Sequence, residues 1–111
     1  MSLASLAEIG VKALRLQEAV DKRRAARANL RSAYSAFRSR YNAGDYIAKG
    51  TERYEMMMED TSAQYALLGA AERAEQSARR SLETVCKRAQ KEIQAGAQAE
   101  AAVRRIMEKA A

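Results

Sequence analysis

Apolar residues recur at alternating steps of three and four along most of the chain, and this spacing limits the fold more than any other feature of the sequence. Such a seven-residue repeat places apolar side chains along one side of an α-helix and is typical of helices that pack together as in a coiled coil. No proline interrupts the repeat in 111 residues, and the common residues Ala, Leu, Arg, Glu and Lys favour helices. The sequence therefore predicts an all-α fold built from long helices.

Two repeats follow each other along the chain, separated by the segment YNAGDY at residues 41–46. Gly44 can adopt the left-handed conformation that ends a helix, and Asp45 can cap the next helix, so we expect a long antiparallel helical hairpin that reverses there. A turn at residues 49–51 with Thr51 as the cap is the alternative, but it does not align the two repeats. The first repeat is Leu6, Ile9, Ala13, Leu16, Val20, Arg23, Arg27, Leu30, Tyr34, Phe37 and Tyr41. The second repeat is Ile47, Thr51, Tyr54, Met58, Thr61, Tyr65, Leu68, Glu72, Glu75, Arg79, Leu82, Cys86, Ala89 and Ile93.

The helix boundaries follow from the same pattern. Ser5 and Glu8 have the spacing of a capping box, which places the start of the first helix at about residue 5. We expect a single domain over residues 1–111. The alanine-rich tail continues the second helix, breaks at Gly96 and folds back, or frays, since a glycine in a helix interior costs about 1 kcal/mol. The predicted elements are helix 1 at about 5–41, a turn at 42–45, helix 2 at about 46–95 and a C-terminal helical tail at 97–110.

Two arginines occupy positions of the first repeat that usually hold apolar residues. If the chain reverses at Gly44, Arg23 faces Tyr65 and Arg27 faces Thr61. A buried guanidinium needs a partner, and it can bond a carboxylate while it stacks on a tyrosine ring, so the pair would fix the alignment of the helices. Alternatively, the side chains reach past the edge of the packed residues into solvent. Neither interpretation requires a ligand.

One flank of the first repeat is small and apolar, which favours close approach of another helix. A two-helix hairpin buries little surface, so we expect hairpins to associate into a multi-helix bundle, with a dimer favoured. The alternative is that these alanines only favour helix formation. Three consecutive methionines at 56–58 add side chains that adapt to irregular partners. The predicted protein-contact residues are Ala19, Ala26, Ala33, Met56, Met57, Tyr54 and Tyr65.

The net charge of +6 suggests an anionic partner as an alternative. Arginines recur every seven residues on the other flank of the first helix, and further cations follow in the second helix; such side chains bind phosphates. Residues 45–75 hold three Lys or Arg against seven Asp or Glu, which offsets this charge, and no base-reading motif accompanies it. The possible nucleic-acid contacts are Lys22, Arg24, Arg31, Arg38, Arg79, Arg80, Lys87, Arg88 and Lys91.

Residues that carry chemistry are scarce. The chain has no histidine and a single cysteine, Cys86, which cannot form an internal disulfide and lies at a position of the repeat expected to pack. Glu52, Glu55 and Glu59 share a helix face, but di-metal bundles usually add histidine to such carboxylates, so we interpret them as solvated or salt-bridged. We therefore expect no catalytic residues, metal or cofactor. The N-terminus lacks a basic signal region and no stretch is apolar enough to span a bilayer, so we expect a cytoplasmic protein.

Together these features predict a non-enzymatic helical interaction protein. It would bind another protein, as an adaptor, chaperone or inhibitor, and would self-associate. The alternative is a nucleic-acid-binding protein that uses the arginine-rich helix face. Binding to an anionic membrane surface is disfavoured because the bulky apolar residues are committed to the hairpin.

Overall fold

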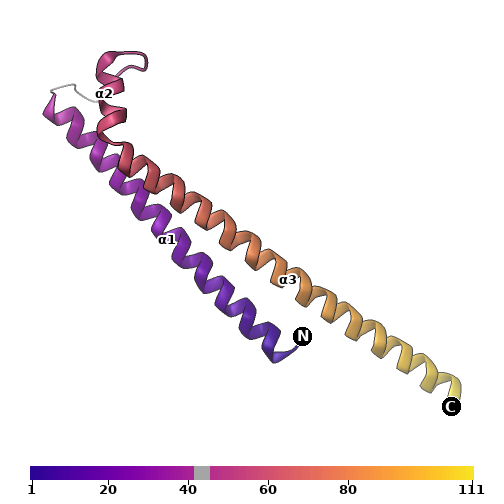
Figure 1. The fold of residues 1–111 in the computed structure, drawn as a ribbon. Helices are drawn as coiled ribbons and strands as arrows, with labels where there is room; N and C mark the ends of the chain where they lie inside the picture. Colours follow the sequence, from indigo (N-terminus) through magenta and orange to yellow (C-terminus); the bar gives the residue numbers. More distant parts are fainter. Residues whose placement is uncertain (42–45) are drawn as a thin grey trace. The chain divides into compact units, whose positions relative to one another are not determined.

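The computed structural model describes residues 1–41 and 46–111, and within these residues the chain forms three α-helices and no strand. The helices are α1 (Leu3–Arg40), α2 (Glu52–Asp60) and α3 (Ser62–Ala110), as Figure 1 shows. α1 packs against α3, so the predicted all-α helical hairpin is confirmed. The predicted turn at 42–45, with Gly44 and Asp45, lies outside the described residues.

Two compact units divide the chain, and each is described by itself. The terminal unit comprises Met1–Leu16 and Ala78–Ala111, and the central unit comprises Gln17–Ser77. The expectation of a single domain over residues 1–111 stays a prediction.

The helices of the central unit are antiparallel, but their alignment differs from the prediction. Arg23 Nε donates to Glu75 Oε2 at 2.7 Å, and Arg27 Nη2 lies 3.6 Å from Glu72 Oε1. The predicted partners, Tyr65 and Thr61, lie about three helical turns earlier in the chain. The predicted alignment is therefore wrong, and both arginines pair with carboxylates that it does not place opposite them.

The second helix begins later than predicted, and this explains the different alignment. Residues 46–51 are not helical, and Gly50 has a φ of 83°, in the left-handed region that suits glycine. Thr51 then caps α2: its Oγ1 accepts a hydrogen bond from the Tyr54 backbone N–H at 3.2 Å and donates one to the Ala48 carbonyl at 2.7 Å. The start of helix 2 at about residue 46 was thus placed too early, and the rejected alternative of Thr51 as the cap is the one found.

A second interruption separates α2 from α3 at Thr61. This residue is almost fully buried, and its Oγ1 donates to the Met57 carbonyl at 2.7 Å. The Met57 carbonyl also accepts from the Thr61 backbone N–H at 3.0 Å, so the hydroxyl group competes for a helix acceptor. The predicted single helix 2 from 46 to 95 is therefore replaced by two helices, α2 and α3. Phe37 of α1 is likewise almost fully buried, and the centroid of its ring lies 4.6 Å from that of Tyr41.

One series of buried and half-buried residues on α1, and another along α2 and α3, recurs at alternating steps of three and four. We call these two series the packed face; further half-buried residues, such as Val20 and Tyr34, border it. On α1 they are Ser5, Ile9, Lys12, Leu16, Ala19, Arg23, Ala26, Leu30, Ala33 and Phe37. On α2 and α3, with the residue between them, they are Met57, Thr61, Gln64, Leu68, Ala71, Glu75, Ala78, Leu82, Val85 and Ala89. Half of the positions match the predicted repeats, and the other half are displaced by one residue. Arg27, predicted in the repeat, has a side chain that is 46% exposed.

The terminal unit holds the first turns of α1 against the second half of α3. Ser5 Oγ donates to Glu92 Oε2 at 3.0 Å, and Arg88 Nη1 donates to Glu8 Oε2 at 3.5 Å. Because these side chains bond α3, Ser5 and Glu8 do not form the predicted capping box. Instead, Ser2 Oγ accepts a hydrogen bond from the Ser5 backbone N–H at 3.1 Å, and α1 begins at Leu3.

α3 runs on past the N-terminus of α1 in the terminal unit (Figure 1). Every residue from 90 to 111 is exposed, and the helix passes through Gly96 without a break. Of the three predicted alternatives for the tail, continuation of the helix is the one found. A single glycine costs about 1 kcal/mol in a helix, which the surrounding alanines and other good helix formers offset. We call residues 95–110 the extension.

Candidate protein-interaction surfaces

The alanines predicted as a contact for another helix lie within the packed face. Ala19 is buried, and Ala26 and Ala33 are half-buried. The prediction placed them on a flank because it took a neighbouring set of residues as the packed one. Small side chains allow two helices to approach closely, and the hairpin itself uses this property.

The methionine and tyrosine residues of the predicted patch divide between interior and surface. Met57 is buried and Tyr54 half-buried, whereas Met56 and Tyr65 are exposed. Of the residues in the patch, only Met56 and Tyr65 therefore offer a large part of their side chains to a partner. Burial raises the pKa of the nearby Tyr34 phenol above its usual value, and the phenols of Tyr54 and Tyr65 raise it further.

The predicted nucleic-acid contacts fall in both units. Lys22, Arg24 and Arg31 are exposed and Arg38 is half-buried in the central unit; the remaining ones lie in the terminal unit. Among the described residues, Arg24, Arg31 and Arg38 form no ion pair. In the terminal unit, Arg88 is engaged with Glu8. All of the predicted contacts in this unit are exposed; they are Arg79, Arg80, Lys87, Arg88 and Lys91.

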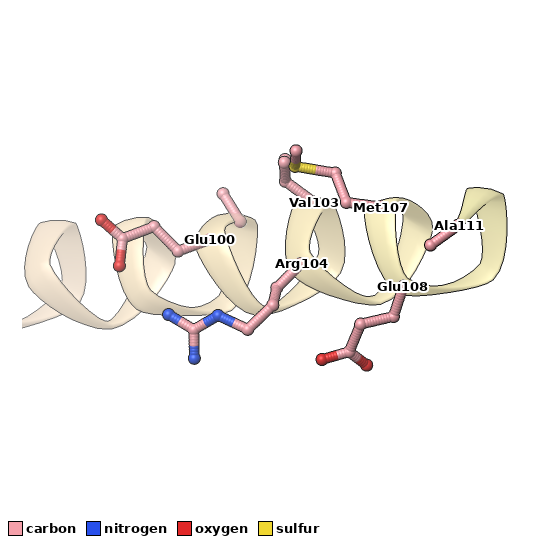
Figure 2. A pocket seen from close by; sticks show the side chains of 7 residues that line it. Glu100, Val103, Arg104, Met107, Glu108 and Ala111 are labelled. Carbon is pink, nitrogen blue, oxygen red and sulfur yellow. The ribbon is translucent and has the colours of Figure 1, made fainter.

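The extension carries an apolar stripe that continues the packed face of α3. From Ala89 the same alternation leads through Glu92 to Gly96, Ala99, Val103, Ile106 and Ala110. Val103, Ile106 and Met107 are 55%, 67% and 67% exposed. In Figure 2, Val103 and Met107 project from the same side of the helix, and Glu100 and Arg104 lie away from them. We call Gly96, Ala99, Val103, Ile106, Met107 and Ala110 the extension stripe.

A second apolar surface lies on the side of α1 that faces away from the packed face in the terminal unit. Leu3 and Leu14 are 83% and 69% exposed, Leu6 is also exposed, and the small residues Ala7 and Gly10 lie between them. We call these five residues the outer α1 face. Successive residues of a helix are about 100° apart, so this set is roughly opposite Ser5, Ile9, Lys12 and Leu16.

Sequence reasoning did not assign either apolar surface of the terminal unit. The second repeat ends at Ile93 in the prediction, and none of the predicted contacts lies in the extension. The signal was the unbroken alternation beyond Ile93, at positions where the first helix has no residues left to oppose it. On α1, the signal was the presence of leucines on two sides of the helix between residues 3 and 16.

The described residues contain no group of three or more Cys, Asp or Glu side chains placed to hold a metal ion. Cys86 is a half-buried free thiol. In the described part of the chain, no helix has a stretch both long and apolar enough to cross a lipid bilayer. Comparisons with protein-family models, curated proteins and solved structures gave no match.

Proposed function

We propose that the chain is a non-enzymatic helical interaction protein of the cytoplasm, which acts by packing exposed helix faces against another protein and self-associates. One observation carries this proposal. The extension is a helix whose apolar side chains Val103, Ile106 and Met107 contact no other helix among the described residues. In proteins, most of the stability of a helix comes from packing of its apolar side, and a partner would supply this packing to the extension.

The chemistry of the extension suits a protein partner. Its apolar stripe is bordered by charged residues of both signs, among them Glu100, Arg104 and Glu108 (Figure 2). An apolar centre with a polar rim is the usual composition of a protein interface. Contiguous exposed apolar side chains on a soluble protein commonly mark such a site.

A photo-crosslinking amino acid at Ile106 tests the proposal in cells that express the protein. We expect crosslinks to one or a few defined proteins, which can be this chain or another. The matched control carries the same amino acid at Ala101, which is exposed on the opposite side of the extension. Equal crosslinking from both positions, or none from Ile106, would contradict binding through the extension stripe.

Nucleic-acid binding is the second candidate, and the row of Arg24, Arg31 and Arg38 is the observation that favours it. These residues are seven apart, and none is neutralised by an ion pair among the described residues. A row of phosphate contacts loses affinity steeply as salt rises. Replacing the three arginines with glutamine should therefore remove salt-sensitive binding to duplex DNA or RNA. Replacing Lys49, Arg53 and Arg73 instead lowers the charge equally and should preserve most of it; equal loss in both variants would indicate non-specific attraction.

A further inference from the structure

We propose that a second copy of this chain covers both apolar surfaces of the terminal unit, in a two-fold dimer in which the extension of each copy packs against the outer α1 face of the other. This inference rests on the proposed function, and it specifies which two surfaces of the chain meet when the chain self-associates. It concerns only residues of the terminal unit.

The first argument is continuity with a contact that already exists. The packed face of α3 binds α1 through Val85 and Ala89, which are each only 4% exposed. The extension stripe continues that row along the same side of the same helix, but α1 begins opposite Glu92, where Ser5 is bonded. A helix that prolonged the line of α1 would therefore meet residues already spaced to receive it.

The second argument is that the outer α1 face fits this requirement. It repeats at the same spacing, with Leu3, Ala7, Gly10 and Leu14 following each other in steps of four and three. A Cβ atom built on Gly10 would meet no other atom within 4 Å, so this part of the face is open to close approach. Leucines that border small residues make ridges and gaps into which Val103 and Ile106 can pack.

The third argument is the match in extent. The outer α1 face and the extension stripe each cover about three to four helical turns. Beyond Leu14, the same side of α1 turns polar with Gln17, Asp21 and Arg24. The apolar surface on α1 therefore ends after nearly the same number of turns as the extension that would cover it.

A two-fold arrangement of two chains covers both apolar surfaces at once, and for this reason we assign a second copy as the occupant. A two-fold axis perpendicular to the helices, near the two N-termini, brings the α1 helices end to end. The α3 helices then lie on opposite sides of the α1 helices. α1 of each copy lies between its own α3 and the partner's extension, as its two opposite apolar sides require. Each copy gives one extension and receives one, so the contact is closed and forms a dimer rather than a filament.

The same symmetry fixes the direction of packing. α3 is antiparallel to α1 within one copy, and the two-fold axis reverses α3, so the partner's extension runs parallel to α1. The start of the extension, at Gly96, then lies beside Leu3, and its end, at Ala110, lies beside Leu14. An arrangement in which two extensions pack on each other would instead place Gly96 beside the partner's Ala110 and leave the outer α1 face uncovered.

Sedimentation of the full chain tests the dimer. We expect a dimer that Ile106→Asp or Leu14→Asp weakens by about tenfold for each damaged contact, and hence about a hundredfold for the two in a symmetric dimer. Ala101→Asp should leave the dimer unchanged, and the helical content of all three variants should match that of the parent chain. Because these side chains are exposed in the single copy, loss of the dimer with retained helix reports on the interface.

Mixing the two damaged variants tests reciprocity. A mixed dimer of Ile106→Asp and Leu14→Asp chains contains one undamaged contact, because the intact extension of one chain meets the intact α1 of the other. Both aspartates fall in the other contact, where the second substitution costs less than the first because the contact is already broken. Dimerisation should therefore be partly restored in the mixture. No restoration would overturn the reciprocal arrangement.

Disulfide formation tests the direction in a Cys86→Ser background. Chains with Leu14→Cys should form a disulfide with chains that carry Ala110→Cys. Chains with Leu3→Cys should not form one with Ala110→Cys chains, because Leu3 lies at the other end of the contact. Crosslinking of Ala110→Cys chains to Gly96→Cys chains instead would show extension-to-extension packing and overturn the inference. A monomer at all concentrations would overturn it too, while crosslinks from Ile106 to a different protein would leave the proposed function standing.

Discussion

The ion pair between Arg23 and Glu75 offers a direct test of how the two arms of the hairpin are aligned. Arg23 Nε lies 2.7 Å from Glu75 Oε2, and the two side chains are only 22% and 15% exposed. Glu75→Ala removes the carboxylate and leaves the guanidinium in the packed face without this partner. Glu75→Gln keeps the size of the side chain and removes its charge, so it separates the loss of charge from the loss of packing.

The expected cost follows from the partial burial. An exposed ion pair contributes about 0–1 kcal/mol to stability, and breaking a fully buried one costs about 3–5 kcal/mol. Because some water still reaches both side chains, we expect Glu75→Ala to lower the free energy of unfolding by about 2 kcal/mol. Each single change, Glu75→Ala or Arg23→Ala, already removes the ion pair, so a double-mutant cycle isolates the energy of the pair itself. We expect a coupling energy of about 1 kcal/mol.

Urea denaturation followed by circular dichroism measures these free energies. All variants are compared at one protein concentration, because self-association adds to apparent stability. The matched control is Tyr65→Ala, at the residue that the sequence had placed opposite Arg23; an exposed side chain should cost no more than about 0.5 kcal/mol. A coupling energy of zero between Arg23 and Glu75, together with a large loss on Tyr65→Ala, would refute the observed alignment.

Three further predictions concern the turn, the glycines and the half-buried phenol of Tyr34. Thr51→Ala should lower the free energy of unfolding by about 1 kcal/mol in urea denaturation, because the cap of α2 is lost, and Thr51→Ser should restore most of it. Gly50→Ala should destabilise by about 1 kcal/mol because its φ is 83°, whereas Gly96→Ala, in an open helical position, should raise helical content and stability by about 0.5–1 kcal/mol; the opposite order would contradict the turn geometry. The pKa of Tyr34 is raised by burial, so its neutral form stabilises the fold below the unfolded pKa, and this contribution is lost as the pH rises through the folded pKa. Stability measured above about pH 10 should therefore fall less in Tyr34→Phe than in the parent chain, and identical pH profiles would contradict this assignment.

The sequence predicts the helices and their hairpin because these depend on local preference and on a repeat that many residues share. It does not resolve which of two neighbouring sets of residues completes the packed face. Ile9, Leu16, Leu30 and Phe37 belong to both solutions, and the choice lies between larger residues such as Val20 and the alanines beside them. In the structure the alanines complete the packed face, because their small side chains let the two helices approach more closely than the larger residues would. Side-chain hydrophobicity alone would have favoured the larger residues.

The position of the turn was less predictable for a different reason. Gly44 with Asp45 and Gly50 with Thr51 are both sound signals for a helix end followed by a helix start. Local chemistry does not choose between them. The prediction used the agreement of the two repeats as the deciding argument, and repeats that are regular along their length also agree at other offsets. Charged partners such as Glu75 for Arg23 discriminate better than apolar spacing does.

The observed alignment can be rationalised by comparing what a longer connection costs with what it buries. A connection from Tyr41 to Thr51, in place of a turn of four residues at 42–45, costs about 1 kcal/mol more in closure entropy. In the predicted alignment, Leu6 faces Leu82, and the residues that follow in α3 have no partner in this chain. The observed alignment buries Val85 and Ala89 to 4% exposure, and one large apolar side chain contributes about 1.5–3 kcal/mol. The longer connection is thus favoured, and among the described residues it shortens the unpartnered part of α3 to the extension.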